Sequence, residues 1–236
     1  MRFVHTLVNR FIDLLNRPSL RYRCILPLAD LLSKNSDEEI LRKSFDFVSN
    51  SGVEGDYLEF GVWKGRSFSR AFNIWKYFFA RKGRLKDLRF FALDSFEGLP
   101  GSSGEFKKGQ YYCSEKDFTA HIKSHGVDMT KVGIIPGWFD KSLNQGVKDK
   151  FSLQKAAVIF IDCDLYESTV PVLEFITDIV QDGTIIVFDD WFCFKGHPGK
   201  GEQLAFKEWL AKNQNITATE WHKVNWKSNS FILHKQ

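Results

Sequence analysis

From residue 55 onward, apolar segments alternate with helical ones, and this alternation constrains the fold more than any other feature. The clearest apolar segments are 156–161 (Ala-Ala-Val-Ile-Phe-Ile) and 184–188 (Thr-Ile-Ile-Val-Phe). Continuous apolar runs are typical of strands that are buried on both faces, as in a parallel sheet covered by helices. We therefore predict a doubly wound α/β domain built on a mostly parallel, seven-stranded sheet.

The other expected elements continue this alternation. Strands are predicted over 57–60, 88–93 and 131–135, and helices over 66–80, 168–180 and 202–212. Two further strand-like runs, 219–226 and 230–234, are separated by Lys-Ser-Asn, which is typical of a hairpin. We expect this C-terminal hairpin to extend one edge of the sheet as an antiparallel pair.

Residues 1–50 are predicted to form a helical extension to a domain of residues 51–236. Apolar residues from Phe3 to Leu15 recur at helical spacing, and Pro18 ends that helix. Ser36, followed by three acidic residues, predicts a second helix that runs to about Asn50. The first helix is amphipathic and mildly basic, so a membrane surface is one possible partner. We favour packing on protein, as a lid or as the contact of a homo-oligomer.

Composition and charge argue against several classes of protein. The chain has 236 residues, of which 43% are hydrophobic and 26% charged, an ordinary globular composition. A net charge of +4 without a nucleic-acid-binding motif argues against a nucleic-acid partner. The four cysteines form no C-x-x-C pair and fit a reducing cytoplasm. No apolar run could span a membrane and no signal peptide is evident, so we expect a cytoplasmic protein.

A glycine loop follows the first predicted strand. Glu59 lies near the end of that strand, Gly61 and Gly65 follow, and a helix begins next to Ser67. Glycines let a ligand approach the backbone, and a helix N-terminus offers free N–H donors, which suits a nucleotide-like ligand. Trp63 stands where G-x-G-x-x-G has its middle glycine, so an ordinary tight turn is the alternative.

Asp94 closes the second predicted strand, where an acidic side chain can accept the ribose hydroxyls of a nucleoside. It lies 29 residues beyond Gly65, so a plain turn residue is the alternative. The glycine-bearing segments 98–104 and 196–201 follow strand ends and are candidate lids. His197, in the second segment, is either a second base or substrate contact, or an exposed loop residue.

Four carboxylates follow two apolar strands that should be neighbours. They are Asp162, Asp164, Asp189 and Asp190. Like charges packed together are costly unless a cation neutralises them, and oxygen ligands suit a hard ion such as Mg²⁺. If the strand continues to Asp164, its side chain shares a face with that of Asp162. The alternative is that Asp164 or Asp189 only caps a helix or turn.

These motifs resemble the macrocin O-methyltransferase family. The matching segments are E-F-G-V at 59–62, D-S-F-E-G-L-P at 94–100, D-x-D-L-Y-x-S-T at 162–169 and the pair at 189–190. Members are S-adenosylmethionine-dependent, metal-dependent sugar O-methyltransferases of antibiotic biosynthesis. The resemblance covers about residues 50–215 and implies a Rossmann-like class I methyltransferase fold.

The resemblance also implies roles for individual residues. S-adenosylmethionine would lie across Glu59, Gly61, Ser67, Asp94 and Ser95. Gly137 and Trp138 fall where such proteins contact the adenine, with core packing of the aromatic ring as the alternative. Mg²⁺ would be held by Asp162, Asp189 and Asp190. Asp164 would then be the general base.

The residues and the resemblance together predict a magnesium-dependent O-methyltransferase that acts on a hydroxyl of a sugar or glycosylated natural product. A metal-dependent glycosyltransferase is the rival enzyme, because Asp162-x-Asp164 fits a D-x-D motif. That reading leaves the 59–65 loop and the Asp189-Asp190 pair unexplained. A non-catalytic partner protein that retains a cofactor fold is the third possibility.

Overall fold

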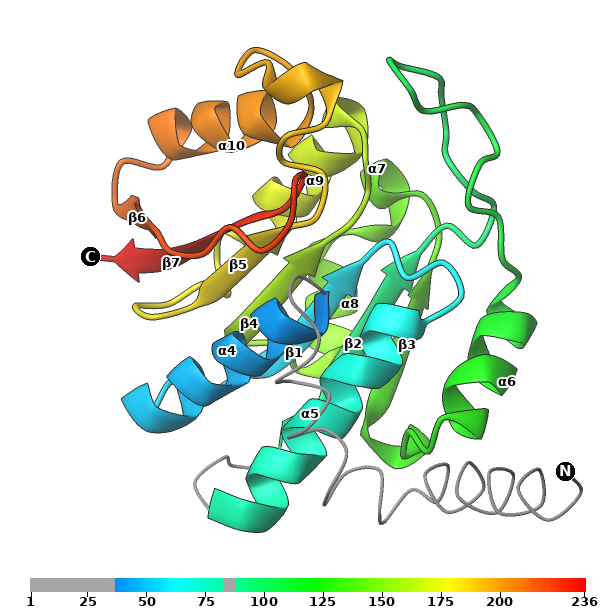
Figure 1. The fold of residues 1–236 in the computed structure, drawn as a ribbon, viewed down its shortest axis with the longest axis vertical. Coiled ribbons are helices and arrows are strands. Elements are labelled where there is room, and N and C mark those ends of the chain that lie inside the picture. The colour runs from blue at the N-terminus through cyan, green and yellow to red at the C-terminus, as the bar shows by residue number, and fades with distance from the viewer. Residues whose placement is uncertain (1–36, 83–87) are drawn as a thin grey trace, which may run out of the picture.

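A seven-stranded sheet organises the computed structural model, which describes residues 37–82 and 88–236 (Figure 1). The strands are β1 Asp56–Phe60, β2 Phe90–Asp94, β3 Val132–Pro136, β4 Ala156–Ile161, β5 Ile185–Phe188, β6 Ile216–Glu220 and β7 Asn229–Lys235. Their order is β3-β2-β1-β4-β5-β7-β6. Strands β1 to β5 run parallel, and the hairpin of β6 and β7 adds antiparallel to β5. The predicted fold class, including the C-terminal hairpin, is therefore confirmed.

Helices cover both faces of the sheet. They are α4 Asp37–Ser51, α5 Arg66–Lys82, α6 Glu115–Ser124, α7 Phe139–Ser142, α8 Gln145–Phe151, α9 Tyr166–Ile176 and α10 Gly201–Lys212, with the short 3₁₀ turns η2 Met129–Lys131 and η3 Phe194–Gly196. Buried side chains of α4, α5 and α6 pack on one face, and those of α9 and α10 on the other. No helix in residues 37–82 and 88–236 is long and apolar enough to cross a membrane.

Aromatic rings fill much of the core beneath α4 and α5. The ring centroid of Phe90 on β2 lies 5.1 Å from Phe72, 5.2 Å from Tyr57 and 5.4 Å from Trp75. Successive strand residues point to opposite faces, so Tyr57 joins this cluster while Leu58 joins the other. Both faces of the parallel strands are thus apolar, and polar groups are left to the strand ends.

Some predicted boundaries differ from the structure. The first hairpin strand is β6 Ile216–Glu220, so its prediction over 219–226 was wrong. The backbone pairing stops at His222, whose N–H donates to the Ser230 hydroxyl (3.0 Å) and whose carbonyl oxygen accepts it (2.8 Å). Asn225 Oδ1 then closes a turn by accepting the backbone N–H groups of Lys227 (2.8 Å) and Ser228 (2.7 Å). Helices α6, α7 and α8 are short and are not predicted from the sequence.

Helix α4 is the described part of the predicted N-terminal extension. Its apolar residues Ile40, Phe45 and Val48 are buried in the same core as α5. The first predicted helix and the cap at Ser36 lie outside the described residues, and the boundary at residue 50 stays a prediction.

The register brings the carboxyl ends of four strands together. Phe60 pairs with Leu93 on one side and Ile161 on the other, and Ile161 pairs with Phe188. Residues that follow these strands therefore meet at one edge of the sheet. The crevice between β1 and β4, where the strand order reverses, is the usual ligand position in such a sheet.

Gly61 makes the closest backbone approach at this edge. Its φ is +84°, and a Cβ built on it would stand 1.8 Å from the backbone oxygen of Asp162. A side chain there would force the loop after β1 away from the end of β4. Gly52 also has a positive φ, +69°, but a Cβ there would meet nothing within 4 Å.

These two glycines form a matched pair of test sites. We expect Gly52→Ala to lower the free energy of unfolding by about 1–2 kcal/mol, the cost of a left-handed residue with a Cβ. Gly61→Ala should lower it by clearly more, because the steric clash with Asp162 adds to that cost. Denaturant unfolding of both variants measures the difference. Equal losses of unfolding free energy in the two variants would show that the close approach at Gly61 adds nothing to the cost of a side chain there.

Candidate functional site

A cavity of about 840 Å³ opens at the carboxyl ends of the parallel strands. Its lining includes eight of the residues predicted for the site: Gly61, Ser67, Asp94, Ser95, Trp138, Asp162, Asp164 and Asp189. Glu59, Gly137 and Asp190 are not lining residues. They support the lining residues from behind through hydrogen bonds.

Asp94 ties the glycine loop to the end of β2. Its Oδ2 accepts the backbone N–H groups of Val62 (2.8 Å) and Trp63 (3.1 Å), and its Oδ1 accepts that of Phe96 (2.8 Å). Burial raises the pKa of Asp94, and the three N–H donors oppose that rise. A carboxylate offers about four acceptor positions, so about one is left for a hydroxyl of a ligand.

Glu59 lies behind Ser67 and is fully buried. It accepts hydrogen bonds from the hydroxyls of Ser67 (2.6 Å) and Tyr57 (2.5 Å). Burial raises the pKa of Glu59 to about 8, although both hydrogen bonds act to lower it. The Ser67 hydroxyl donates its proton to Glu59 and lines the cavity, so its lone pairs are directed by Glu59.

Gly137 and Trp138 follow β3. The N–H of Gly137 donates to the backbone oxygen of Asp94 (2.9 Å), which holds this segment against the end of β2. Trp138 is half-buried and lines the cavity with Phe139. Trp138, the predicted aromatic contact of the adenine, thus lies on the same side of the cavity as Asp94.

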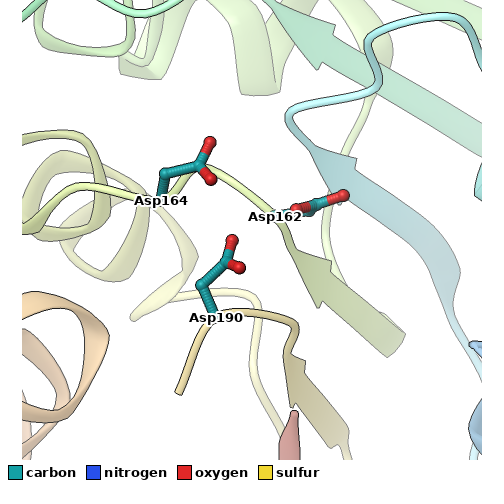
Figure 2. A group of neighbouring side chains, drawn as sticks. All are labelled: Asp162, Asp164 and Asp190. Carbon is teal, nitrogen blue, oxygen red and sulfur yellow. The ribbon is translucent and has the colours of Figure 1, made fainter. Parts of the chain in front are cut away.

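Three carboxylates converge on one point at the ends of β4 and β5. Asp162, Asp164 and Asp190 each offer one oxygen, and these oxygens lie within 4.8 Å of one another (Figure 2). Oxygen donors at this spacing have the chemistry of a site for a hard divalent ion. One oxygen of Asp190, Oδ2, is buried and has no hydrogen-bond partner among the described residues.

Asp164 reaches this cluster through a turn and not through the strand. Strand β4 ends at Ile161, and the N–H of Leu165 donates to the backbone oxygen of Cys163 (2.6 Å), which places Asp164 at the centre of a three-residue turn. Its φ of 62° is left-handed, an uncommon conformation for a residue other than glycine. The strand therefore does not continue to Asp164, and the side chains of Asp162 and Asp164 meet by way of this turn.

Burial and mutual repulsion shape the charge of the cluster. Burial, followed by the negative charge of Asp190, raises the pKa of Asp164 to about 8. The pKa of Asp162 is also raised, by burial and then by Asp189 and Asp190. A divalent cation at this point would relieve both effects.

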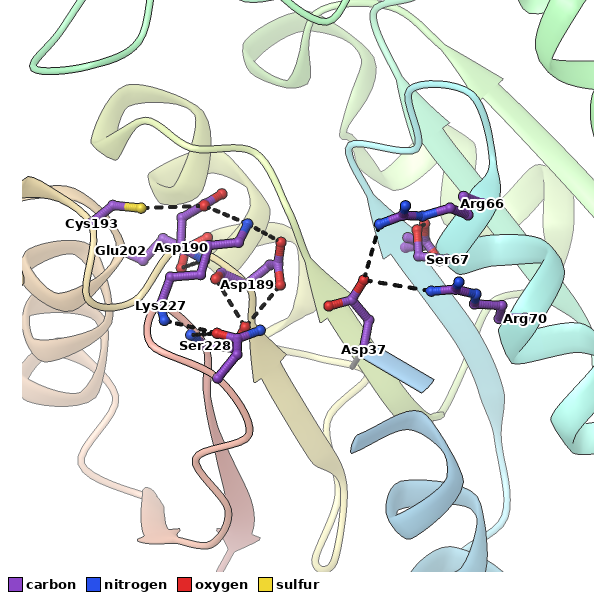
Figure 3. Close-up of polar contacts among 12 residues, drawn as sticks. Asp37, Arg66, Ser67, Arg70, Asp189, Asp190, Cys193, Glu202, Lys227 and Ser228 are labelled. Atoms are coloured by element: carbon purple, nitrogen blue, oxygen red, sulfur yellow. Dashed lines mark hydrogen bonds and ion pairs between the residues drawn. The ribbon is translucent and has the colours of Figure 1, made fainter. Parts of the chain in front are cut away.

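Asp189 is directed elsewhere (Figure 3). It contacts the ammonium group of Lys227, and its Oδ1 accepts the hydroxyl of Ser228 (2.9 Å). Lys227 also donates to Asp190 Oδ1 at 2.9 Å. The structure thus brings Asp164 together with Asp162 and Asp190, whereas the sequence grouped Asp189 with them.

Lys227 and Glu202 are site residues that the sequence analysis missed. Lys227 was placed in the turn of the predicted hairpin, so nothing marked it as a cavity residue. Glu202, in the first turn of α10, is 1% exposed, and its Oε2 accepts the backbone N–H of Asp190 at 3.0 Å. An acidic residue at a helix start is ordinary, and only the packing of α10 on β5 reveals that this one is buried.

Residues that flank the two candidate lid segments, 98–104 and 196–201, touch each other. The N–H of Phe194 donates to Glu105 (3.3 Å), and the rings of Phe106 and Phe194 lie 5.7 Å apart. Leu99, Lys108 and Tyr111 of the first segment and its extension line the cavity. His197 is exposed, is not a lining residue, and accepts the N–H of Gly199 at 3.0 Å.

Over most of its length, the chain is similar to proteins of one known family. The family described as Macrocin-O-methyltransferase (TylF) matches residues 36–228. Demethyldecarbamoylnovobiocin O-methyltransferase of Streptomyces niveus is 27% identical over 164 residues, which are 65% of this chain and 59% of that protein. The 8-demethyl-8-(2,3-dimethoxy-alpha-L-rhamnosyl)-tetracenomycin-C 4'-O-methyltransferase of Streptomyces olivaceus is 29% identical, over 64% of this chain and 58% of that protein. The chain thus spans about three fifths of the length of these relatives.

A solved structure shows the same fold. The O-methyltransferase NovP superposes with a TM-score of 0.69 at 21% sequence identity, over 84% of this chain and 79% of that chain. The described residues therefore adopt the Rossmann-like class I O-methyltransferase fold.

The buried Glu59 predicts a pH dependence of stability. Between its ordinary pKa of 4.5 and about 8, the folded protein retains a proton that the unfolded chain releases. The free energy of unfolding contributed by Glu59 is therefore present below pH 4.5 and falls as the pH rises towards 8. We expect Glu59→Gln to gain stability relative to wild type across this window, by at most about 1.4 kcal/mol per pH unit. Denaturant unfolding at several pH values measures this, and parallel curves would contradict a proton held on Glu59.

Proposed function

Because the chain belongs to the macrocin O-methyltransferase family, we propose that it is an S-adenosylmethionine-dependent O-methyltransferase. Its acceptor would be a hydroxyl of a sugar or glycosylated natural product. The observation that carries this proposal is one cavity with a glycine loop on its β1 and β2 side and a carboxylate cluster on its β4 and β5 side. Such a cavity can bring a methyl donor and an activated hydroxyl together.

The β1 to β3 side of the cavity supports the binding of the methyl donor. Ser67 and Asp94 offer hydrogen-bonding groups, and Trp138 offers an aromatic wall. Ser95 lines the same side, and Gly61 leaves the backbone accessible there. Glu59 and Gly137 act behind this lining by holding Ser67 and the segment that carries Trp138. The bound cofactor would supply an electrophilic methyl group on a sulfonium.

The carboxylates have a donor set that fits magnesium. Their ligand atoms are all oxygens, and the partnerless Asp190 Oδ2 is a buried acceptor that a cation would satisfy. We assign the ion to Asp162, Asp189 and Asp190. Bound magnesium would supply positive charge that lowers the pKa of an acceptor hydroxyl.

Asp164 is assigned as the general base. Its carboxylate lines the cavity beside Asp162 and Asp190, where an acceptor hydroxyl can approach it. Burial and Asp190 keep its pKa near 8, so Asp164 readily holds a proton near neutral pH. Additional positive charge beside it would favour the ionised form, which can take the proton of the acceptor hydroxyl.

Ligand-dependent melting tests the choice of cofactor. The demethylated cofactor S-adenosylhomocysteine should raise the melting temperature, whereas nucleotide sugars should not. Asp94→Asn should weaken this binding by about 1–3 kcal/mol, because a ligand hydroxyl loses its charged acceptor. Glu97→Gln, an exposed position in the next turn, is the matched control. Stabilisation by a nucleotide sugar alone would favour a glycosyltransferase.

Asp164→Asn tests the assigned base. Asparagine tolerates the left-handed backbone of this position, so the fold should persist. We expect methyl transfer to slow by about 10²–10⁴-fold, while metal and cofactor binding stay nearly unchanged. Asp140→Asn, at an exposed carboxylate of the same cavity, is the control. The measurement is single-turnover transfer of labelled methyl to an acceptor found by screening glycosides.

The result also separates the base from the metal ligands. If Asp164→Asn loses the metal and Asp162→Asn keeps it, the two roles are exchanged. If neither change alters turnover, the metal-assisted mechanism is wrong for this protein.

A further inference from the structure

The ammonium group of Lys227 lies between the carboxylates of Asp189 and Asp190 (Figure 3). It is 2.9 Å from Asp190 Oδ1 and also contacts Asp189 Oδ2. The Lys227 side chain is 28% exposed, whereas those of Asp189 and Asp190 are 8% and 3% exposed. Charge-assisted bonds to such buried carboxylates are stronger than surface ion pairs.

The backbone of Lys227 is held in place, and its side chain borders the cavity. Its N–H donates to Asn225 Oδ1, and its carbonyl oxygen accepts the N–H of Phe192 (2.8 Å). The neighbouring Ser228 donates its hydroxyl to Asp189 Oδ1. Lys227 itself lines the cavity, so its ammonium can leave the carboxylates without any change in this backbone.

The two carboxylates that bind Lys227 are also metal ligands in the proposed assignment. A divalent ion held by Asp189 and Asp190 would lie close to the lysine ammonium, and like charges in such a buried place repel strongly. The ammonium and the ion therefore compete for these carboxylates. The pairing of Asp189 with Lys227 and Ser228 also accounts for its absence from the group of three converging carboxylates in the described residues.

We propose that Lys227 is a tethered counter-ion for the carboxylate cluster. It neutralises Asp189 and Asp190 in the metal-free protein, and a divalent cation displaces its ammonium into the cavity. The inference rests on the proposed function, because it takes Asp189 and Asp190 as metal ligands. The alternative to displacement is that Lys227 stays on the carboxylates and the ion binds only Asp162, Asp164 and Asp190.

Manganese binding to the whole chain tests this without any methyl transfer. Calorimetry at one fixed pH, with no cofactor or acceptor, compares wild type with Lys227→Met, Lys227→Arg and Lys223→Met. Lys223 is the matched control, because it lies in the same segment but pairs with the exposed Glu220. We expect Lys227→Met to bind Mn²⁺ about 10- to 100-fold more tightly, since the ion no longer breaks two charge-assisted bonds. Lys227→Arg should bind no more tightly than wild type, and Lys223→Met should match it.

Thermal unfolding supplies a second readout. Without metal, Lys227→Met should melt at a lower temperature than wild type, because two buried carboxylates lose their counter-ion. Added Mn²⁺ should restore more stability to this variant than to wild type. A Lys227→Met protein that folds only when Mn²⁺ is present would support the proposal as well.

Asp189→Asn distinguishes displacement from retention of the lysine. Displacement predicts that this variant binds Mn²⁺ more weakly, since a ligand is lost, whereas retention predicts unchanged affinity. If wild type binds Mn²⁺ and Lys227→Met binds it equally or more weakly, the counter-ion role is overturned while the proposed metal site stands. If neither wild type nor Lys227→Met binds Mn²⁺, the proposed magnesium site fails and the counter-ion role fails with it.

Discussion

Negative charge confined to one edge of a parallel sheet is the constraint on which the rest of the site depends. Ile161 at the end of β4 pairs with Phe188 at the end of β5. The acidic residues that follow these two strands are therefore brought close together although their charges repel. Burial and repulsion raise the pKa of Asp162 in particular. Both faces of the sheet are filled with apolar side chains, which offer carboxylates no partner. The positive charge that compensates these carboxylates must come from outside the parallel strands. Lys227, on the segment before β7, supplies it.

Backbone strain gathers around the same edge. Trp63, Phe96, Tyr111, Asp164 and Phe194 all have positive φ values without being glycine. Such conformations cost of order 1–3 kcal/mol each and persist where the surroundings enforce them. Asp94 holds two of these residues in place, because its carboxylate accepts the backbone N–H groups of Trp63 and Phe96. The loops are thus held in place before any ligand arrives, which lowers the entropic cost of binding.

The fold follows from the sequence because its strands are continuous apolar runs whose burial on both faces allows few arrangements. The carboxylates and Asp94 could be placed for the same reason, since the end of each strand is a fixed point in a parallel sheet. The directions in which the side chains point could not be predicted in this way. Asp164 turns toward Asp162 through a tight turn, and Lys227 reaches the site from a turn that Asn225 closes after β6 has ended. Both turns depend on hydrogen bonds beyond the strands, which the hydrophobic periodicity of the sequence does not reveal.

The reversal of strand order gives the cavity two sides with separate tasks. Strands β1, β2 and β3 carry the loops of the proposed donor side, and β4 and β5 carry the carboxylates. The two sides meet at Gly61, where the chain after β1 touches the backbone of Asp162. In-line transfer of a methyl group requires donor and acceptor within about 3–3.5 Å. The missing side chain at Gly61 lets the two sides of the cavity approach each other, as the proposed transfer would require.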